Sequence, residues 1–189
     1  MANGTLKVSN IQTSSGSGTI TLGQSGETIT IPSGCTITNS GTQTGFGGVN
    51  TPAFHAQGSG TQVLSSGTIT KMTFATEVYD SSSKYDTSTS RFTPGEAGKF
   101  FIFANSKFNA DNGSGAQTYQ IRIYKNGSVQ TPAMLNGVYD VSAQIITSNV
   151  SGIVTSSNTT DYFEIYGYAD GTNRSVYDSR IFGGYKIIE

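Results

Sequence analysis

Very few side chains in this 189-residue sequence are of the kinds that catalyse reactions or bind metals. There is one histidine, His55, and one cysteine, Cys35. A structural zinc site needs several such ligands, so these two are too few. The chain has neither a G-x-S-x-G nucleophile motif nor a phosphate-binding P-loop, and no pair of carboxylates stands out for glycoside hydrolysis. We therefore predict no enzymatic activity and no catalytic residues, and we expect a structural or interface role for His55.

Two loops offer oxygen ligands of the kind that calcium prefers. The segment NADNGSG contains Asp111 and Asn112. The segment YADGTNRS contains Asp170 and Asn173. Aspartate and asparagine side chains also cap their own backbone in ordinary turns. We favour the turn interpretation and predict no cofactor and no metal ligands, with calcium as the alternative.

The composition excludes several classes of function. Charged residues make up 12% of the chain, about half the usual share, and the net charge is −1. No basic cluster is present, which argues against nucleic-acid binding. The start, MANGTLKVSN, lacks the features of a secretory signal, and no run approaches the ~20 apolar residues of a membrane span. We expect synthesis in a cytosol and no membrane insertion.

The composition changes near residue 50. Before that point the chain carries one aromatic residue, Phe46, and two charged residues, Lys7 and Glu27. Glycine and proline mark a boundary in TGFGGVNTP, residues 44–52. We predict a β-rich arm or stem over residues 1–50, which anchors the protein to a particle, and a globular head over 51–189.

The arm contains a short internal repeat: GTITLG at 18–23, ETITIPSG at 27–34 and CTITNSG at 35–41. Each copy alternates apolar residues with threonine and then turns at glycine or serine. Such short strands must stack on each other, on identical chains or on a host surface, and a flexible linker is the alternative. We favour ordered β structure because the apolar positions are regular: Ile20, Leu22, Ile29, Ile31 and Ile37.

The head is predicted to be β structure almost throughout, since no long stripe with helical periodicity occurs. The clearest hairpin is YQIRIYKNGSVQ, in which Asn126 and Gly127 suit a type I′ turn. Strands at this spacing predict an antiparallel sandwich or jelly roll. The candidate strands are 53–57, 61–64, 68–79, 99–108, 117–125, 128–134, 138–154, 161–169 and 179–188.

One of these strands, KFFIFAN, is more apolar than a half-buried strand should be. Phe100 and Ile102 lie on one face, and Phe101 and Phe103 on the other. One pair fills the core, and the other pair is expected to face a neighbouring chain. A shift of one residue in register exchanges the pairs, so the pattern leaves this assignment open.

A second strand, DYFEIYGYA, shows a similar excess. Phe163 and Ile165 are expected to point inward, which leaves three tyrosines on the outer face. Tyrosine is enriched in protein interfaces, because it joins apolar area to a polar tip. We therefore expect another copy of the same chain to cover these tyrosines, and the alternative is a corner buried within one chain. The predicted contact between chains comprises Phe100, Ile102, Tyr162, Tyr166, Tyr168, Phe182 and Tyr185.

Residues 85–188 resemble the jelly-roll heads of the complement globular-head and tumour-necrosis-factor-like superfamily. The landmarks occur in the order YD, FTPGEAGKFFIF, YKNG, VSGIV, TDYFEI and SRIFGGYKI. PAFHAQ at 52–57 would then be the first strand. The resemblance implies a trimer whose axis is lined by aromatic and apolar residues. This sequence departs from animal members because no collagen-like Gly-X-Y stalk precedes the head.

The repeats of the arm resemble the Thr/Ile/Gly/Ser repeats of bacteriophage fibre and virion-surface proteins. Our first hypothesis is a viral structural protein, a homotrimeric capsid decoration or head-fibre protein on the virion surface, assembled in the host cytoplasm. Residues 1–50 would bind the major capsid protein or a tail component. The alternative is a tail-fibre tip or receptor-binding adhesin that recognises a host surface glycan or protein.

Overall fold

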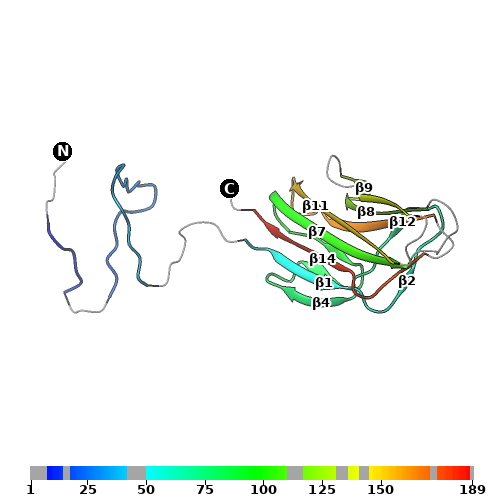
Figure 1. Ribbon diagram of the computed structural model, residues 1–189. Helices are drawn as coiled ribbons and strands as arrows, with labels where there is room; N and C mark the ends of the chain where they lie inside the picture. The colour runs from blue at the N-terminus through cyan, green and yellow to red at the C-terminus, as the bar shows by residue number, and fades with distance from the viewer. Residues whose placement is uncertain are drawn as a thin grey trace. The chain divides into compact units, whose positions relative to one another are not determined.

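The computed structural model describes residues 8–14, 18–41, 50–109, 117–130, 136–140, 145–170 and 174–187. The chain divides into two compact units, Met1–Thr44 and Gly45–Glu189. None of these described residues lies in a helix, and all the strands lie in the second unit (Figure 1). The all-β class predicted from the sequence is therefore confirmed. Across the described part of the chain, no helix is long and apolar enough to cross a membrane.

The first of two sheets, sheet A, has β7 at its centre. β7 pairs antiparallel with β11 on one side and with β14 on the other. β14 pairs in turn with β1, and β1 with β4, and Figure 1 shows β7, β14, β1 and β4 side by side in one layer. The strands are β2 (Gln62–Val63), β13 (Ser175–Val176), β7 (Gly98–Asn109), β14 (Ile181–Lys186), β1 (Ala53–Gln57), β4 (Thr76–Asp80) and β11 (Ile145–Ser156).

The second sheet, sheet B, is built on the antiparallel pair β8 and β12. The turn residues Asn126 and Gly127 have φ of 50° and 76°, which confirms the predicted hairpin turn. Neighbouring strands are mostly not consecutive in the chain, as expected for a jelly roll. The strands are β10 (Asn136–Asp140), β8 (Gln117–Lys125), β12 (Phe163–Ala169), β6 (Arg91–Phe92), β5 (Tyr85–Asp86), β3 (Thr70–Lys71) and β9 (Ser128–Val129).

Aromatic rings from both sheets form the core. Phe54 of sheet A stacks on Phe92 of sheet B with 4.3 Å between ring centroids. Phe182 meets Phe54 edge to face at 4.8 Å, and Phe100 packs 6.3 Å from Phe163. These offset and edge-to-face contacts are the arrangements that aromatic rings prefer. They hold the two sheets together as a sandwich.

The alternation along β7 settles the register that the sequence left open. Phe100 and Ile102 point inward and are 0% exposed, whereas Phe101 and Phe103 point outward and are partly exposed. Phe182 is likewise 0% exposed. Our expectation that Phe100, Ile102 and Phe182 contact a neighbouring chain is therefore wrong. The core of a single chain covers these side chains completely, and they have no surface left for a partner.

Some predicted strands are divided in the structure. The expected strand 68–79 consists of β3, in sheet B, and β4, in sheet A. Between them the chain crosses from one sheet to the other, and Met72 and Phe74 are fully buried. The backbone N–H of Phe74 donates to Ser90 Oγ at 2.8 Å instead of joining a ladder. Likewise β10 and β11 stand where one strand, 138–154, was expected, and the short strands β5, β6 and β13 were not predicted.

A fully buried arginine ties together three stretches of chain around sheet A. Arg180 donates from Nε to the carbonyl oxygen of Thr73 at 2.7 Å. Its Nη1 donates to the carbonyl oxygens of Gly60 and Tyr177, both at 2.8 Å. A Cβ at Gly58 would collide with this side chain, so glycine is needed there. Carbonyl dipoles thus compensate the charge of the buried guanidinium group.

Replacing Arg180 by methionine keeps most of the side chain's length and removes its hydrogen bonds. Three backbone carbonyl groups then lose a donor, so we expect the free energy of unfolding to fall by about 2–4 kcal/mol. Urea denaturation followed by circular dichroism measures this loss. The control Ser59→Ala, an exposed position beside Gly60, should change the value by less than about 0.5 kcal/mol. Equal losses in the two variants would contradict a specific role for the guanidinium group.

Candidate assembly surface

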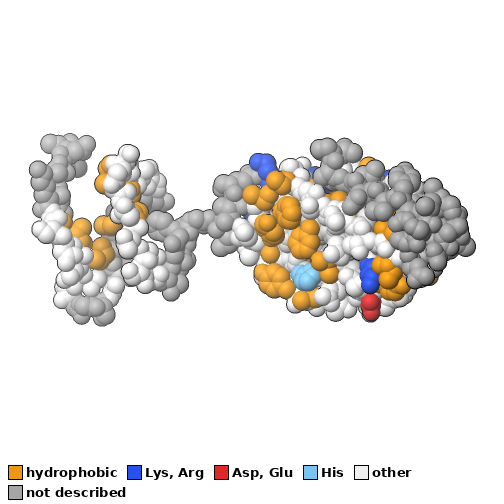
Figure 2. Space-filling model, viewed as in Figure 1, with side chains coloured by type: hydrophobic (Ala, Val, Ile, Leu, Met, Phe, Trp, Pro, Cys, Tyr) orange, Lys and Arg blue, Asp and Glu red, His pale blue; other side chains and the backbone are white. Residues whose placement is uncertain are grey.

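The outward face of sheet A carries a band of apolar side chains. Two cross-strand rows form the band, because neighbouring strands place paired residues side by side. The first row is Ala53, Tyr185, Phe101 and Ile153. The second row is Tyr79, His55, Gly183, Phe103 and Ser151. We call Tyr79, His55, Phe103, Tyr185, Phe101 and Ile153 the sheet A patch. Figure 2 shows apolar side chains gathered around the histidine on this face.

Large parts of these side chains are exposed to solvent. Ile153 is 61% exposed, Tyr79 52% and Tyr185 37%. Phe101 packs against Tyr185 with 5.5 Å between ring centroids and against Phe103 with 6.2 Å, so the rings form one continuous surface. Monomeric proteins rarely expose large contiguous apolar areas, and such areas mark sites of association. The sheet A patch is therefore the strongest candidate for a contact surface.

Two successive glycines of β14 help to shape this surface. A Cβ at Gly183 would collide with the ring of Phe103, whose tip occupies the space that a side chain would need. A Cβ at Gly184 would point the other way, 2.9 Å from the carbonyl oxygen of Phe101 and against the core. The pair thus lets Phe103 cover the sheet on one side and lets the core close on the other.

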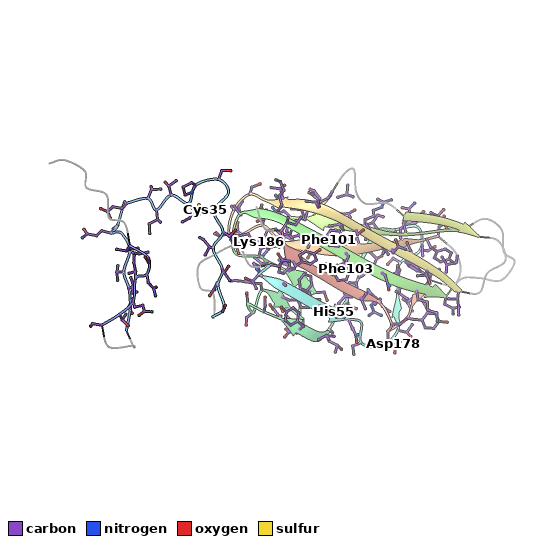
Figure 3. The ribbon with its side chains drawn as sticks, turned by 60° about the vertical axis from the view of Figure 1, so that its left-hand side comes forward. Cys35, His55, Phe101, Phe103, Asp178 and Lys186 are labelled. Carbon is purple, nitrogen blue, oxygen red and sulfur yellow. The ribbon has the colours of Figure 1, made fainter. Side chains whose placement is uncertain are left out.

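His55 lies within the sheet A patch, beside Phe101 and Phe103 in Figure 3. Its Nε2 atom is buried and has no hydrogen-bond partner in the described part of the chain. This imidazole lies among apolar side chains of the patch, which is the setting of a contact residue and not of a metal ligand. The described residues contain no group of three or more histidine, cysteine, aspartate or glutamate side chains that could hold a metal ion.

Polar residues border the sheet A patch on both sides. The row beyond Phe103 includes Gln57, Asn105 and Asn149. Beyond Phe101, Lys99 pairs with Thr155 across β7 and β11, and Lys186 and Glu96 form an ion pair nearby. An apolar centre with a polar rim is the usual anatomy of a protein–protein contact.

The three outer tyrosines predicted from β12 lie on the other side of the sandwich. Tyr162, Tyr166 and Tyr168 are partly exposed on the outer face of sheet B. The guanidinium carbon of Arg91 lies 3.7 Å from the ring centroid of Tyr162, and the ring of Tyr124 lies 4.1 Å from that of Tyr166. Side chains of the same chain thus supply much of the cover that we expected from a neighbour.

A buried carboxylate organises this second face. Glu164 is 2% exposed, and its Oε1 accepts from Lys71 Nζ at 2.5 Å and from Arg91 Nε at 3.1 Å. The hydroxyl of Tyr166 approaches Glu164 Oε2 at 3.4 Å. Burial, and then the charge of Glu164, raise the pKa of Tyr166. The tyrosine therefore stays neutral, and the face is held by a paired network.

The remaining predicted site residues are dispersed. Cys35 is exposed in the first unit, far along the chain from His55. Asp170 accepts a hydrogen bond from the backbone N–H of Thr118 at 2.6 Å, and this bond reaches across to β8 and lies outside its own turn. The other proposed calcium ligands, Asp111, Asn112 and Asn173, lie outside the described residues. Calcium binding stays untested.

Comparison with known proteins identifies the fold. No protein-family model matches the chain, and no curated protein matches it either. The structure is similar to the globular domain of zebrafish complement 1qA protein, with a TM-score of 0.51 and 18% sequence identity. The match covers 72% of this chain and 96% of that one. The head therefore has the jelly-roll fold of the complement globular domain, as its sequence landmarks predicted, and an identity this low shows the fold alone.

The two adjacent glycines of β14 allow a test of which face of sheet A is the core face and which is the outer face. Gly184→Ala should lower the free energy of unfolding by about 1–3 kcal/mol, because the new methyl group overfills the core. Gly183→Ala should cost less than about 1 kcal/mol, because only the ring of Phe103 must move. Tyrosine fluorescence during urea unfolding, at a protein concentration low enough to separate chains, measures both values. Equal losses would show that the assignment of the faces is wrong.

Proposed function

We propose that this protein is a homotrimeric structural protein of a bacteriophage particle, a capsid decoration or head-fibre protein. Its heads associate through the sheet A patch, and residues 1–50 attach the trimer to the particle. The observation that carries the proposal is the exposed apolar band across sheet A. This band lies on a head that is already well packed, so intramolecular folding does not account for it.

Several features support self-association. A closed ring of three copies uses two different surfaces of each chain, one against each neighbour. The sheet A patch offers two different surfaces of this kind. One lies at β4 and includes Tyr79, and the other lies at β11 and includes Ile153. The resemblance to the complement globular-head superfamily also implies a trimer with an apolar and aromatic axis. The buried Nε2 of His55 has no hydrogen-bond partner among the described residues, so a polar group of a neighbouring chain would relieve the cost of its burial.

The particle role is supported by the arm. Its sequence is low in charge and resembles the repeats of phage virion-surface proteins. On this proposal the protein lies on the virion surface after assembly in the host cytoplasm. Its partner is the major capsid protein or a tail component, and the protein catalyses no reaction.

Placing a carboxylate in the sheet A patch should separate the chains. We expect Phe103→Asp to convert a trimer into monomers at micromolar concentration, because an unpaired charge in an apolar contact costs several kcal/mol. Native mass spectrometry measures the state, and circular dichroism should show an unchanged fold. The matched control Tyr168→Asp, on the outer face of sheet B, should remain trimeric. A monomeric unmodified protein, or a trimer lost only in the control, would overturn the assignment.

Removal of residues 1–50 tests the role of the arm. The head should still fold and associate, because its core and the sheet A patch lie within the second unit. It should no longer sediment with phage particles that lack the protein, whereas the full chain should bind them. Binding of the truncated head at an undiminished level would place the attachment surface in the head.

A second function, recognition of a host surface, is favoured by the outer face of sheet B. Tyrosine and arginine dominate the energetics of many binding surfaces. The outer face of sheet B presents both residue types, and it stays accessible when neighbouring heads cover the sheet A patch. The buried Nε of Arg122 has no partner in the described part of the chain. Inhibition of phage adsorption by the purified protein, together with its loss in Arg122→Ala, would favour receptor binding. Hundreds of copies per particle, fixed on the shell, would favour decoration.

A further inference from the structure

The arm exposes apolar side chains that one chain does not cover. Seven of them, in the described residues of the first unit, are between 42% and 61% exposed. None of these described residues belongs to a strand. The arm therefore has both the apolar surface and the backbone groups to accept strand partners. The seven residues are Val8, Ile11, Ile20, Leu22, Ile29, Ile31 and Ile37.

The sequence pattern of these residues suits short strands joined by turns. Ile29 and Ile31 are two apart, so an extended backbone places them on one face and Thr28 and Thr30 on the other. The backbone N–H of Glu27 donates to the carbonyl oxygen of Gln24 at 3.0 Å, which closes a turn before this segment. A second turn follows, in which Cys35 N–H donates to the carbonyl oxygen of Pro32 at 3.2 Å. The glycines of these turns, Gly26 and Gly34, have φ of 88° and 85°.

We propose that residues 18–41 pair with the same residues of other copies of this chain and form a closed β-stem of three chains. In the stem, the isoleucine and leucine face of each copy points toward the common axis, and the threonine face points toward water. The inference rests on the proposed self-association of the heads. It adds that the arm becomes ordered only in the assembled trimer, so that the particle is bound by a three-chain stem.

The path of the chain favours copies as the partners. The arm connects through residues 45–52 to Ala53, and Ala53 begins β1 in the first row of the sheet A patch. Heads that associate through this patch therefore bring the start of β1 in each copy to a shared surface. Such tethering gives each arm a high effective concentration of the other arms, which favours pairing without further contacts.

The charge distribution is also compatible with pairing of identical segments. Glu27 is the one charged residue between 18 and 41. Its carboxylate turns back on its own turn, where Oε2 accepts from the backbone N–H of Gln24 at 2.6 Å. Like charges opposite each other destabilise paired strands, and this segment places almost none there. The three similar repeats also offer matching strand lengths in every copy.

Cys35 provides a probe for the full-length protein, since it is the one cysteine of the sequence and is exposed in a single chain. A nitroxide spin label on Cys35 should show dipolar broadening in the trimer. Labels on paired copies would lie within about 15 Å, because adjacent strands are about 4.8 Å apart. Hydrogen exchange gives a label-free measure, and the amides of residues 18–41 should exchange at least about tenfold more slowly in the trimer than in the monomeric Phe103→Asp variant.

Two matched double variants test which face of residues 28–31 points toward the axis of the stem. The double change Ile29→Asp with Ile31→Asp should abolish the broadening and the protection while the heads remain trimeric. The control, Thr28→Asp with Thr30→Asp, adds the same charges on the outer face and should keep both signals. Loss in the control alone would overturn the proposed orientation of the stem.

Three other outcomes are informative. Trimeric heads with distant labels would overturn the stem and leave the proposed self-association standing. Labels that approach one another only after particles are added would also overturn it, because the partner would then be a particle protein. A full-length protein that is monomeric would overturn the proposed self-association, and the stem with it.

Discussion

The strict alternation of side chains along β7 is the constraint on which the molecule depends. The central strand of sheet A has four large apolar residues in succession, and a strand can give only every second one to the core. Phe100 and Ile102 are fully buried in the sandwich, where Phe100 packs against the rings of Phe92 and Phe163 of sheet B. Phe101 and Phe103 are thereby committed to the outer face. The same strand thus contributes to both the core and the sheet A patch. A shift in the register of β7 would therefore alter both.

The outer faces of the two sheets differ in how their aromatic residues are covered. On sheet B, the buried carboxylate of Glu164 draws in Lys71 and Arg91, and the cations and neighbouring rings cover the tyrosines. On sheet A, the aromatic residues pack mainly against one another, near His55, whose Nε2 has no hydrogen-bond partner among the described residues. The outer face of sheet B is thus largely covered by an internal network, whereas the sheet A patch leaves Ile153 61% and Tyr79 52% exposed. An exposed and contiguous apolar area favours contact with another molecule.

Local patterns in the sequence predicted much of this fold. The Asn126–Gly127 turn and the inward positions of Phe163 and Ile165 depend on a few adjacent residues, and all were correct. Which apolar pair of β7 enters the core was beyond these patterns, because both pairs are equally hydrophobic. Contacts with distant strands decide it.

The network of sheet B shows the same limit more clearly. Lys71 and Arg91 lie 93 and 73 residues from Glu164 in the chain. No local sequence pattern pairs them with Glu164. The tyrosines of this strand were therefore predicted to lie in an interface, although side chains of the same chain partly cover them. Similarly, Phe182 could be recognised as apolar, but its side of β14 follows from Gly183, whose missing side chain makes room for Phe103 on the outer face. The sequence therefore predicted these strands, whereas tertiary pairing decides which face each residue occupies.

The buried guanidinium of Arg180 has a consequence for the conditions in which the head can remain folded. Many extracellular β-domains join their loops with a calcium ion, which a chelator or a dilute medium can remove. Here the cation is covalently part of the chain, and a guanidinium keeps its proton across the physiological pH range. The carbonyl groups of Thr73, Gly60 and Tyr177 are held by this fixed charge. The junction that they form is therefore independent of the divalent-ion content of its surroundings.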